Sequence, residues 1–420
     1  MNNDIITPNN YLNVTKLNWL YIDINSYFAT IEQQVNPDLR NKPIIVVAVL
    51  SDYTSVIAAS FDAKLKGIKT GTKVKEAKSL CPELICILAN HKVYVEYHKK
   101  IFAEVEKYLP VEHIFSIDEA ACRLTADQCN IDNAIALAKQ IKLAIRQSVG
   151  EYISCSIGIA PNRYLAKIAT DMQKPDGLVV ITPEDIPNKI YSVKLRDLPG
   201  VGRNMHNRLN SYGITTVEKL YNLPAKLLRK VWGSITGEKL WYLLRGADLP
   251  FEQTKSSSIS HSQVLALELR ISNKARDIAV NLILKAAQRL RKRELYTSSI
   301  ILVIRTQDDK SLESKIKLKP SADDITLSKL LLKIWDELIK INKIVSIKKI
   351  AITLSNLETK PQQLTFDDIV NKQADNKKYL LSQSIDKLNN KYGSDVVKLG
   401  KLPKTNKSSF LIAFQHIPKS

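Results

Sequence analysis

Two absences narrow the class of protein before any motif is considered. The five cysteines, at positions 81, 86, 122, 129 and 155, form no Cys-x-x-Cys pair and are odd in number, so neither a zinc ribbon nor a disulfide framework is indicated. No run of about 18 apolar residues occurs, and residues 1–16 are polar and lack a signal-peptide core. We therefore expect a soluble, cytoplasmic protein with reduced thiols, no membrane partner and a disordered N-terminal extension over residues 1–16.

Acidic residues are in short supply in the second part of the chain. Residues 1–180 hold 20 Lys and Arg against 19 Asp and Glu, whereas residues 181–420 hold 42 against 23, so almost all of the net charge of +20 lies in the second part. A basic surface of this size favours a polyanionic partner, and nucleic acid is the usual one. A solvated Lys-rich surface is the alternative. The chain has 420 residues, 45% of them hydrophobic, which is enough for about two to four globular domains.

Three carboxylates close apolar segments in the nearly neutral part of the chain. Asp23 lies at the end of one such segment, and the pair Asp118-Glu119 follows another. Mg2+ prefers oxygen ligands in octahedral geometry, so this set predicts a site for two divalent cations of the kind that activates phosphates. Single Asp residues at strand ends are also common turn formers. Because neighbouring strand residues point to opposite faces, Asp118 and Glu119 share a site only if the chain bends there.

The spacing of apolar residues predicts alternating strands and helices up to about residue 181. Strands are expected at 20–24, 44–50, 55–59, 85–88, 111–115, 120–124 and 153–159. Helices are expected at 27–35, 61–66, 74–80, 94–108 and 131–147, and a further helix, capped by Asn162, ends at Lys174-Pro175. This βαββαβ-like order predicts a small antiparallel or mixed sheet with helices on one face.

Two short features of the middle region suit phosphate groups. Lys174, held at a rigid turn close to the predicted sheet, is placed to meet a triphosphate as a point charge, although an ordinary lysine at a helix C-terminus is the alternative. The run Leu198-Pro199-Gly200-Val201-Gly202, followed by an amphipathic helix, predicts a helix-hairpin-helix whose backbone N–H groups approach a DNA phosphate. A generic glycine turn between helices is the alternative there.

A separate α+β domain is predicted after a polar linker at residues 254–260. Strands are expected at 262–269, 298–305, 315–318 and 349–354, and helices at 275–293 and 326–341. Positive charge gathers at the end of the first of these helices, at Arg289, Arg291, Lys292 and Arg293.

Three motifs then carry a resemblance to a known family. They are Tyr-Ile-Asp-Ile-Asn-Ser-Tyr-Phe-Ala-Thr-Ile-Glu at 21–32, Ser-Ile-Asp-Glu-Ala at 116–120, and a third motif in three pieces. Its pieces are Cys-Ser-Ile-Gly-Ile-Ala at 155–160, Asn162 through Lys167, and Asp-Met-Gln-Lys-Pro-Asp-Gly at 171–177. In this order, and together with the helix-hairpin-helix, they resemble the Y family (UmuC/DinB type) of translesion DNA polymerases over about residues 17–400.

The resemblance implies an α+β, multi-domain, right-hand polymerase. It implies a ferredoxin-like palm at 17–27 and 91–181, small fingers at 28–90, and a helical thumb with the helix-hairpin-helix at 182–250. A linker at 251–260 would lead to an α+β little finger at 261–358 that binds DNA. Residues 359–420 would form a C-terminal tail.

The resemblance also implies a mechanism and a set of roles. Two Mg2+ ions would be held by Asp23, Asp118, Glu119 and the carbonyl of Ile24, and would align a primer 3′-hydroxyl with the α-phosphate of a deoxynucleoside triphosphate. Phe28 would be the steric gate against a ribose 2′-hydroxyl. The nucleotide contacts would be Tyr27, Phe28, Phe61, Lys64 and Lys174. The contacts to primer-template DNA would be Gly200, Gly202, Arg203, Arg289, Arg291, Lys292 and Arg293.

The chain departs from the family pattern at two places. The fingers usually carry a Tyr and an Arg where Phe61 and Lys64 stand, so a hydroxyl donor and a bidentate fork are lost and weaker nucleotide binding is expected. The tail carries Gln363, Leu364 and Phe366 where bacterial members have a sliding-clamp motif, but it lacks one apolar position. This segment is either a weak clamp ligand or a linker.

Three other classes of function were weighed against a low-fidelity, monomeric damage-bypass polymerase without proofreading. A catalytically weak or inactive family member acting as a DNA-bound scaffold keeps some support from Phe61 and Lys64, although the carboxylates are intact. A non-enzymatic DNA-binding protein explains the basic region but not the carboxylates. A nucleotide cyclase shares a palm-like fold, but its Gly-Gly-acidic hairpin is absent.

Overall fold

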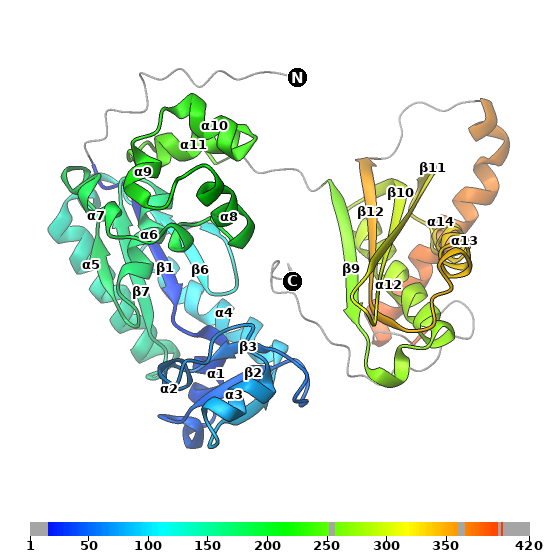
Figure 1. The fold of residues 1–420 in the computed structure, drawn as a ribbon, viewed down its shortest axis with the longest axis horizontal. Helices are drawn as coiled ribbons and strands as arrows, with labels where there is room; N and C mark the ends of the chain where they lie inside the picture. Colours follow the sequence, from blue (N-terminus) through cyan, green and yellow to red (C-terminus); the bar gives the residue numbers. More distant parts are fainter. Residues whose placement is uncertain (1–15, 252–256, 360–365, 394–395, 398–420) are drawn as a thin grey trace. The chain divides into compact units, whose positions relative to one another are not determined.

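The computed structural model describes residues 16–251, 257–359, 366–393 and 396–397, with the backbone alone described for 366–375. The chain divides into two compact units, with the boundary between Phe251 and Glu252 (Figure 1). Among the described residues, no helix is long and apolar enough to cross a membrane. Each unit is described by itself below.

A five-stranded sheet forms the centre of the first unit. Its order is β5-β6-β1-β7-β8, and all neighbours are antiparallel except β7 and β8. The strands are β1 (Trp19–Ile24), β5 (Val111–Ile114), β6 (Glu119–Arg123), β7 (Cys155–Ala160) and β8 (Leu178–Val180). All residues of the central strand β1 are buried. The mixed sheet predicted from the sequence is confirmed.

Helices cover both faces of this sheet. On one face, Ile22 and Ile24 share a core with Ile101 of α4 (His91–Glu106) and Ile141 of α5 (Ile131–Ala144), which continues as a π-helical segment at Ile145–Val149. On the other face, Trp19 and Tyr21 pack with α6 (Arg163–Met172). The prediction of helices on one face is therefore wrong. Neighbouring side chains of β1 point to opposite faces of the sheet, and those on both faces are apolar: Leu20 and Ile22 on one, Trp19 and Tyr21 on the other. Both faces of the sheet must therefore be covered.

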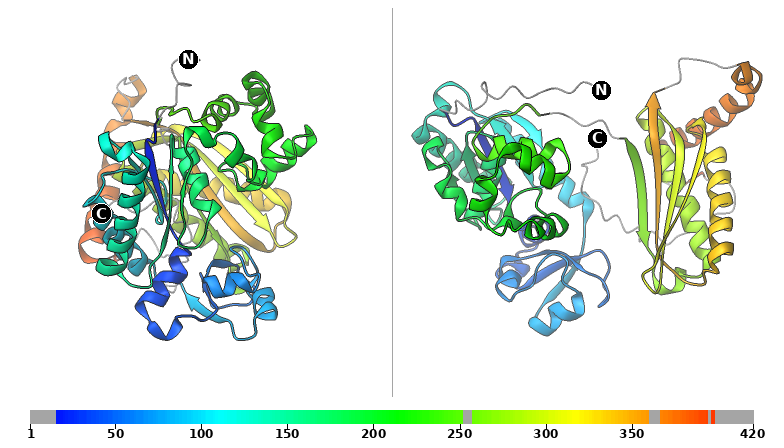
Figure 2. Two further views of the ribbon diagram at one scale, coloured as in Figure 1. Left: turned by 90° about the vertical axis from the view of Figure 1, so that its left-hand side faces the viewer. Right: turned by 45° about the horizontal axis from the view of Figure 1, so that its top comes forward.

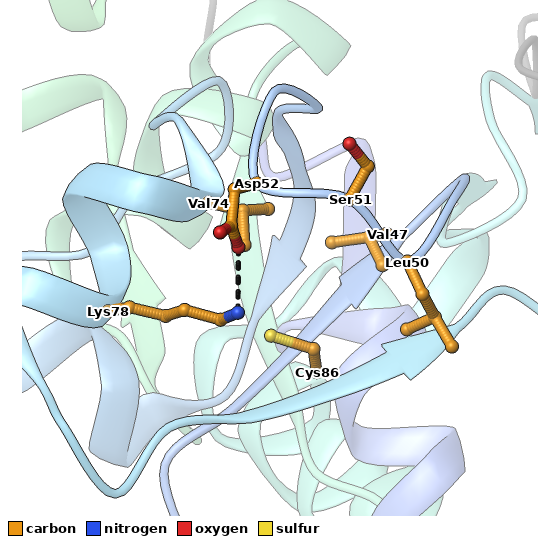
Figure 3. A pocket seen from close by; sticks show the side chains of 7 residues that line it. All are labelled: Val47, Leu50, Ser51, Asp52, Val74, Lys78 and Cys86. Atoms are coloured by element: carbon orange, nitrogen blue, oxygen red, sulfur yellow. Dashed lines mark hydrogen bonds and ion pairs between the residues drawn. The ribbon is translucent and has the colours of Figure 1, made fainter. Parts of the chain in front are cut away.

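A smaller sheet, β3-β2-β4, lies in the same unit, with the parallel pair β2 and β4. Its strands are β2 (Ile44–Val47), β3 (Val56–Ala59) and β4 (Ile85–Leu88), and the accompanying helices are α1 (Tyr27–Val35), α2 (Phe61–Leu65) and α3 (Val74–Leu80). A pocket of about 310 Å³ opens beside this sheet and is crossed by a 2.7 Å ion pair between Lys78 and Asp52 (Figure 3). None of the predicted site residues lines it.

Short helices complete the first unit. They are α7 (Asn188–Tyr191), α8 (Arg203–Ser211), α9 (Val217–Tyr221), α10 (Ala225–Trp232) and α11 (Ile235–Leu244). Their apolar side chains join the core on the α6 face of the sheet, through Leu209, Leu228 and Leu240 among others. Gly200 has φ +86°, which favours glycine, and the 3-10 turn at Leu195–Asp197 and this glycine lead into α8.

The second unit is a four-stranded antiparallel sheet, β11-β10-β12-β9, with α12 and α13 on one face (Figure 2). Its elements are β9 (Ser258–Val264), α12 (Ser272–Lys292), β10 (Leu295–Thr306), β11 (Ser311–Ser321), α13 (Asp324–Asn342), β12 (Ile347–Thr359) and α14 (Phe366–Tyr392). Two predictions need correction. The first strand begins at Ser258, so residues 258–260 of the expected linker are paired with β12, and residues 265–269 are not part of it. The expected tail contains the long helix α14.

Candidate active site

The three predicted carboxylates meet at one end of the central strand. Asp23 of β1 pairs with Glu119, the first residue of β6, and Asp118 lies just before that strand in a bend. The N–H of Ile24 donates to the carbonyl of Asp118 at 2.9 Å. In an extended strand the N–H and C=O of one residue point to the same side, so the Ile24 carbonyl is expected on the side of Asp118. The bend required for Asp118 and Glu119 to serve one site is present.

Burial and mutual repulsion set the charge state of these groups. Burial raises the pKa of Asp118, and the neighbouring charge of Asp23 adds to this effect, while a hydrogen bond from Ser116 opposes it. Burial likewise raises the pKa of Glu119, although Lys167 partly offsets it. Burial acts in the same direction on Asp23, but Lys167 and Lys174 outweigh it and lower the pKa of that carboxyl. A positive charge beside these groups favours their ionised forms, as Lys167 and Lys174 do for Asp23.

Lys167 is the cation beside Asp23 and Glu119; the sequence places it in the third motif, but no role was predicted for it. Its Nζ lies 2.5 Å from Asp23 Oδ2 and 2.6 Å from Glu119 Oε1. Lys174 Nζ lies 2.8 Å from Asp23 Oδ2 and 2.6 Å from Asp171 Oδ1. Lys167, Asp171 and Lys174 are spaced at i, i+4 and i+7 along and just beyond α6, which places them on one face. That spacing was the available signal.

The donor atoms of this cluster are carboxylate oxygens, which suit a divalent cation. Within the described part of the chain, no group of three or more His, Cys, Asp or Glu side chains is arranged as a metal cage. The chemistry of the donors nevertheless fits a hard cation, because carboxylate oxygens converge on a positive charge, here the Lys167 ammonium between Asp23 and Glu119. A divalent cation would take the place of that ammonium.

Asn25 fixes the turn that carries Lys174, and this role was also missed. The Asn25 Oδ1 accepts a hydrogen bond from the N–H of Asp176 at 2.8 Å, and its Nδ2 donates to Ser156 Oγ at 3.0 Å. The N–H of Gly177 donates to the same Ser156 oxygen at 3.2 Å. These bonds tie the segment after α6 to the ends of β1 and β7, and so hold Lys174 beside Asp23.

The predicted nucleotide contacts surround the start of α1. The Phe28 ring is half-buried, 4.7 Å from the ring of Tyr94 and 5.5 Å from that of Tyr27. Tyr27 is buried and its hydroxyl donates to the carbonyl of Tyr94 at 2.6 Å, which leaves only its backbone available to a nucleotide. Phe61 is exposed at the start of α2.

Lys64 also reaches the site. Its Nζ donates to Ser26 Oγ at 2.7 Å, directly before α1. Burial lowers the pKa of Lys64, and the like charge of Lys174 lowers it further, while Asp23 opposes both. The two lysines and the carboxylate are therefore close enough to interact, and a further anion beside them would relieve the repulsion between the lysines.

The residues predicted to contact DNA differ in how exposed they are. Gly202 is the N-cap of α8 and Arg203 its first residue, and a side chain at Gly200 or Gly202 would meet open space. Arg291 is buried, so the prediction that it contacts DNA is wrong: its guanidinium pairs with Asp324 at 2.7 Å and Asp386 at 2.6 Å. Arg289 lies beside His261, and Lys292 and Arg293 are exposed. The predicted clamp segment lies outside the described residues, apart from the backbone of Phe366.

The sheet brings paired acidic strand ends together with lysines from an adjoining helix, an arrangement that resembles the one in nucleotidyltransferases of the right-hand polymerase class. Three family models match the chain: the impB/mucB/samB family at residues 22–171, the DNA polymerase-iota thumb domain at 196–248, and the impB/mucB/samB family C-terminal domain at 256–366. The chain belongs to the Y family (UmuC/DinB type) of DNA polymerases, the translesion enzymes.

Curated relatives and solved structures agree with this assignment. The chain is 35% identical to DNA polymerase IV of Moorella thermoacetica over 278 residues, which are 65% of this chain and 69% of the relative. It is 27% identical to DNA polymerase IV of Bacillus velezensis over 92% of this chain and 94% of the relative. A Y-family DNA polymerase chimera shares the fold, with a TM-score of 0.69 at 23% identity over 82% of this chain and 100% of that structure. An insertion ternary complex of Dbh DNA polymerase is 26% identical, with a TM-score of 0.52 over the same shares.

The assignment decides between the classes of function considered from the sequence. The chain is a DNA-directed DNA polymerase, and a scaffold without activity is not favoured. A nucleotide cyclase and a DNA-binding protein without catalysis do not account for the three matched models. Y-family DNA polymerases generally depend on divalent metal ions.

Proposed function

We propose that this polymerase adds deoxynucleotides to a primer 3′-hydroxyl on damaged templates at the cluster of Asp23, Asp118 and Glu119. The observation that carries the proposal is the convergence of these carboxylates with Lys167 and Lys174 at the end of β1. Two Mg2+ ions, held by the three carboxylates and the Ile24 carbonyl, would supply an activated 3′-hydroxyl and neutralise charge on the leaving pyrophosphate.

The chain's own residues prepare this chemistry. Lys167 balances the charge of Asp23 and Glu119 and keeps both carboxylates together at the position that a cation takes. The hydroxyl of Tyr21 donates to Glu119 Oε2 at 3.2 Å, and that of Ser116 donates to Asp118 Oδ1 at 2.5 Å, so each carboxylate is held in one orientation. Such fixed oxygens need little rearrangement when charge develops in the transition state.

Lys174 and Lys64 are proposed to hold the triphosphate of the incoming nucleotide. Both are ammonium groups beside Asp23, and both act as point charges without the bidentate geometry of arginine. With Phe61 in place of a hydroxyl donor, weaker nucleotide binding than in typical family members stays a prediction. Phe28 is proposed to exclude a ribose 2′-hydroxyl.

Replacing Phe28 with alanine is expected to raise ribonucleotide insertion relative to deoxynucleotide insertion by about tenfold or more. The ring is fixed against Tyr94 and Tyr27, so it cannot swing away from an added hydroxyl, and a tenfold change corresponds to about 1.4 kcal/mol. The ratio of kcat/KM for the two sugars in primer extension measures the effect. Unchanged sugar selectivity in a folded Phe28→Ala protein would remove Phe28 from this role.

The DNA-binding surfaces are proposed from charge and backbone geometry. In the first unit, the backbone at Gly200 and Gly202 together with Arg203 would contact phosphates. In the second unit, the sheet face opposite the helices carries alternate exposed lysines of β11, namely Lys315, Lys317 and Lys319. These side chains suit a sequence-independent contact with the DNA backbone, as do Lys292 and Arg293.

Other parts of the proposal rest on the family alone. They are a palm at 17–27 and 91–181, fingers at 28–90, a thumb at 182–250 and a little finger, whose sheet begins at Ser258 and ends at Thr359. Low fidelity without proofreading, a monomeric state, a cytoplasmic location, and weak clamp binding through Gln363, Leu364 and Phe366 are proposed on the same ground.

Primer extension on undamaged and lesion-containing templates tests the proposed function. With Mg2+ present, the full-length protein is expected to extend the primer on both templates. A reaction without divalent metal provides the control. Extension that stops quantitatively at the lesion would contradict the damage-bypass part of the proposal, and absent extension on both templates would contradict the whole of it.

A further inference from the structure

A set of aromatic side chains begins in the same row of the palm sheet as the catalytic carboxylates. Phe115 follows β5 and its N–H donates to the carbonyl of Glu119, which itself pairs with Asp23. The next row on that face contains His113, Ala121 and Tyr21. The row after it contains Arg123 and Trp19. The rows are about 7 Å apart, since a strand rises about 3.4 Å per residue.

Two of these rings, His113 and Phe115, form a connected surface with Phe251, which lies in the segment after α11; we call these three residues the aromatic platform. The ring centroids of Phe115 and Phe251 are 5.8 Å apart, and His113 lies 4.5 Å from Phe251 and 6.0 Å from Phe115. Phe115 is 39% exposed and Phe251 is 46% exposed, so a continuous apolar surface faces solvent beside the active site. Such a surface at a functional site favours a binding role.

The platform is built to keep its position. The Tyr21 ring stacks on Phe115 at 5.6 Å while its hydroxyl binds Glu119, so a single side chain connects the platform to the catalytic cluster. Behind it, the guanidinium of Arg163 lies between Trp19 and Phe251, at 4.9 and 4.8 Å from their ring centroids. Because these contacts already hold the rings in place, little side-chain entropy is lost when a ligand binds to them.

We propose that the aromatic platform packs against the deoxyribose faces of the last nucleotides of the primer strand. This inference rests on the proposed polymerase function and assigns residues that hold the primer end. Lys174 contacts Asp23 and approaches Lys64, which places the triphosphate-binding charges on that side of the cluster, whereas the platform adjoins Glu119. One strand of a DNA duplex rises about 3.4 Å along the helix axis for each nucleotide, so a row spacing of about 7 Å corresponds to about two nucleotides of rise along that axis.

The local charges favour a sugar contact over a phosphate contact. Glu112 lies 3.4 Å from His113 Nε2, and Asp248 and Glu112 each pair with Arg123 at 3.2 Å. Glu112 and Asp248 also act on Arg163, so the two carboxylates near the rings balance the positive charges of Arg123 and Arg163. An apolar ring face therefore suits the uncharged sugar of the primer better than its phosphates.

Alanine substitution of the two exposed rings tests the platform by DNA affinity. Phe115→Ala and Phe251→Ala are each expected to weaken primer-template binding by about fivefold to tenfold, as for the loss of one aromatic contact to a nucleotide. Fluorescence anisotropy with a primer that ends in a dideoxynucleotide measures this without catalysis. Tyr108→Ala is the matched control, because Tyr108 is also 39% exposed but lies beyond α4, on the other side of the sheet. Thermal unfolding verifies that each variant is folded.

A strand-specific crosslink separates this inference from the polymerase function. With p-benzoylphenylalanine in place of Phe115, irradiation is expected to label the terminal two nucleotides of the primer strand. Crosslinking to the template strand alone, or full DNA affinity in both alanine variants, would overturn the platform even if the protein extends primers. A protein that crosslinks to the primer end but extends no primer would contradict the proposed function and leave the platform standing.

Discussion

Replacing Asp118 with alanine is expected to lower the rate of primer extension by about a thousandfold or more, which corresponds to about 4 kcal/mol of transition-state stabilisation. Ser116 holds the Asp118 carboxylate by a hydrogen bond, and the charges of Asp118 and Asp23 interact. The substitution therefore removes a carboxylate that lies beside both Asp23 and the backbone of Ile24. Primer-template affinity is expected to stay within about twofold, because the basic surfaces proposed to bind DNA are elsewhere. Single-turnover extension and anisotropy measure the two quantities.

Asp132→Ala is the matched control for this prediction. Asp132 is an exposed carboxylate in the first turn of α5, and its removal also changes the net charge by one without touching the catalytic cluster. This variant is expected to extend primers at nearly the original rate. An Asp118→Ala protein that retains extension within about tenfold would show that the chemistry does not depend on the carboxylate cluster.

The carboxylates were predictable from the sequence because each lies next to an apolar strand in the chain itself. Lys167 and Asn25 were not, because their roles arise from packing between distant segments. Lys167 reaches Asp23, 144 positions away, only after α6 has packed across β1 and β7. Asn25 contacts Asp176, 151 positions away, through a turn whose path the sequence does not determine locally. The type of a residue and its immediate neighbours can be read from the sequence, whereas the groups that a charged side chain contacts depend on the tertiary structure.

The error at Arg291 has a related physical cause. Four basic residues near the end of α12 suggest one positive patch, but a helix turns by about 100° per residue, so neighbours in the sequence face different directions. Arg291 points inward with Leu290 and Ala287, whereas Lys292 and Arg293 are exposed. One of its partners, Asp386, comes from α14, which was expected to be part of a tail. Without that helix, the sequence offered no burial site for this arginine.

Replacing Arg291 with alanine is expected to lower the free energy of unfolding of the second unit by about 3–5 kcal/mol, because removal of one member of a buried ion pair leaves its partners uncompensated. Its side chain is 3% exposed, and it binds Asp324, Asp386 and the carbonyl of Ala322. Burial already raises the pKa of Asp324, although Arg291 opposes this, so loss of Arg291 raises that pKa further. When the pKa of a carboxyl is higher in the folded state than in the unfolded state, its contribution to stability is fully present below the unfolded-state pKa. That contribution is lost as the pH rises through the folded-state pKa. The defect is therefore expected to be smaller near pH 4 than at pH 7.

Denaturant unfolding of the full-length protein, followed by far-ultraviolet circular dichroism at both pH values, measures this prediction. Lys292→Ala is the control, because it removes an exposed charge from the same helical turn and is expected to change stability by less than about 0.5 kcal/mol. In a triple variant, Arg291→Met with Asp324→Leu and Asp386→Leu, most of the lost stability is expected to return, because no uncompensated charge remains buried. If Arg291→Ala instead weakened DNA binding while leaving stability unchanged, Arg291 would be a DNA contact after all. The recovery in the triple variant is the result that a DNA-binding role would not produce.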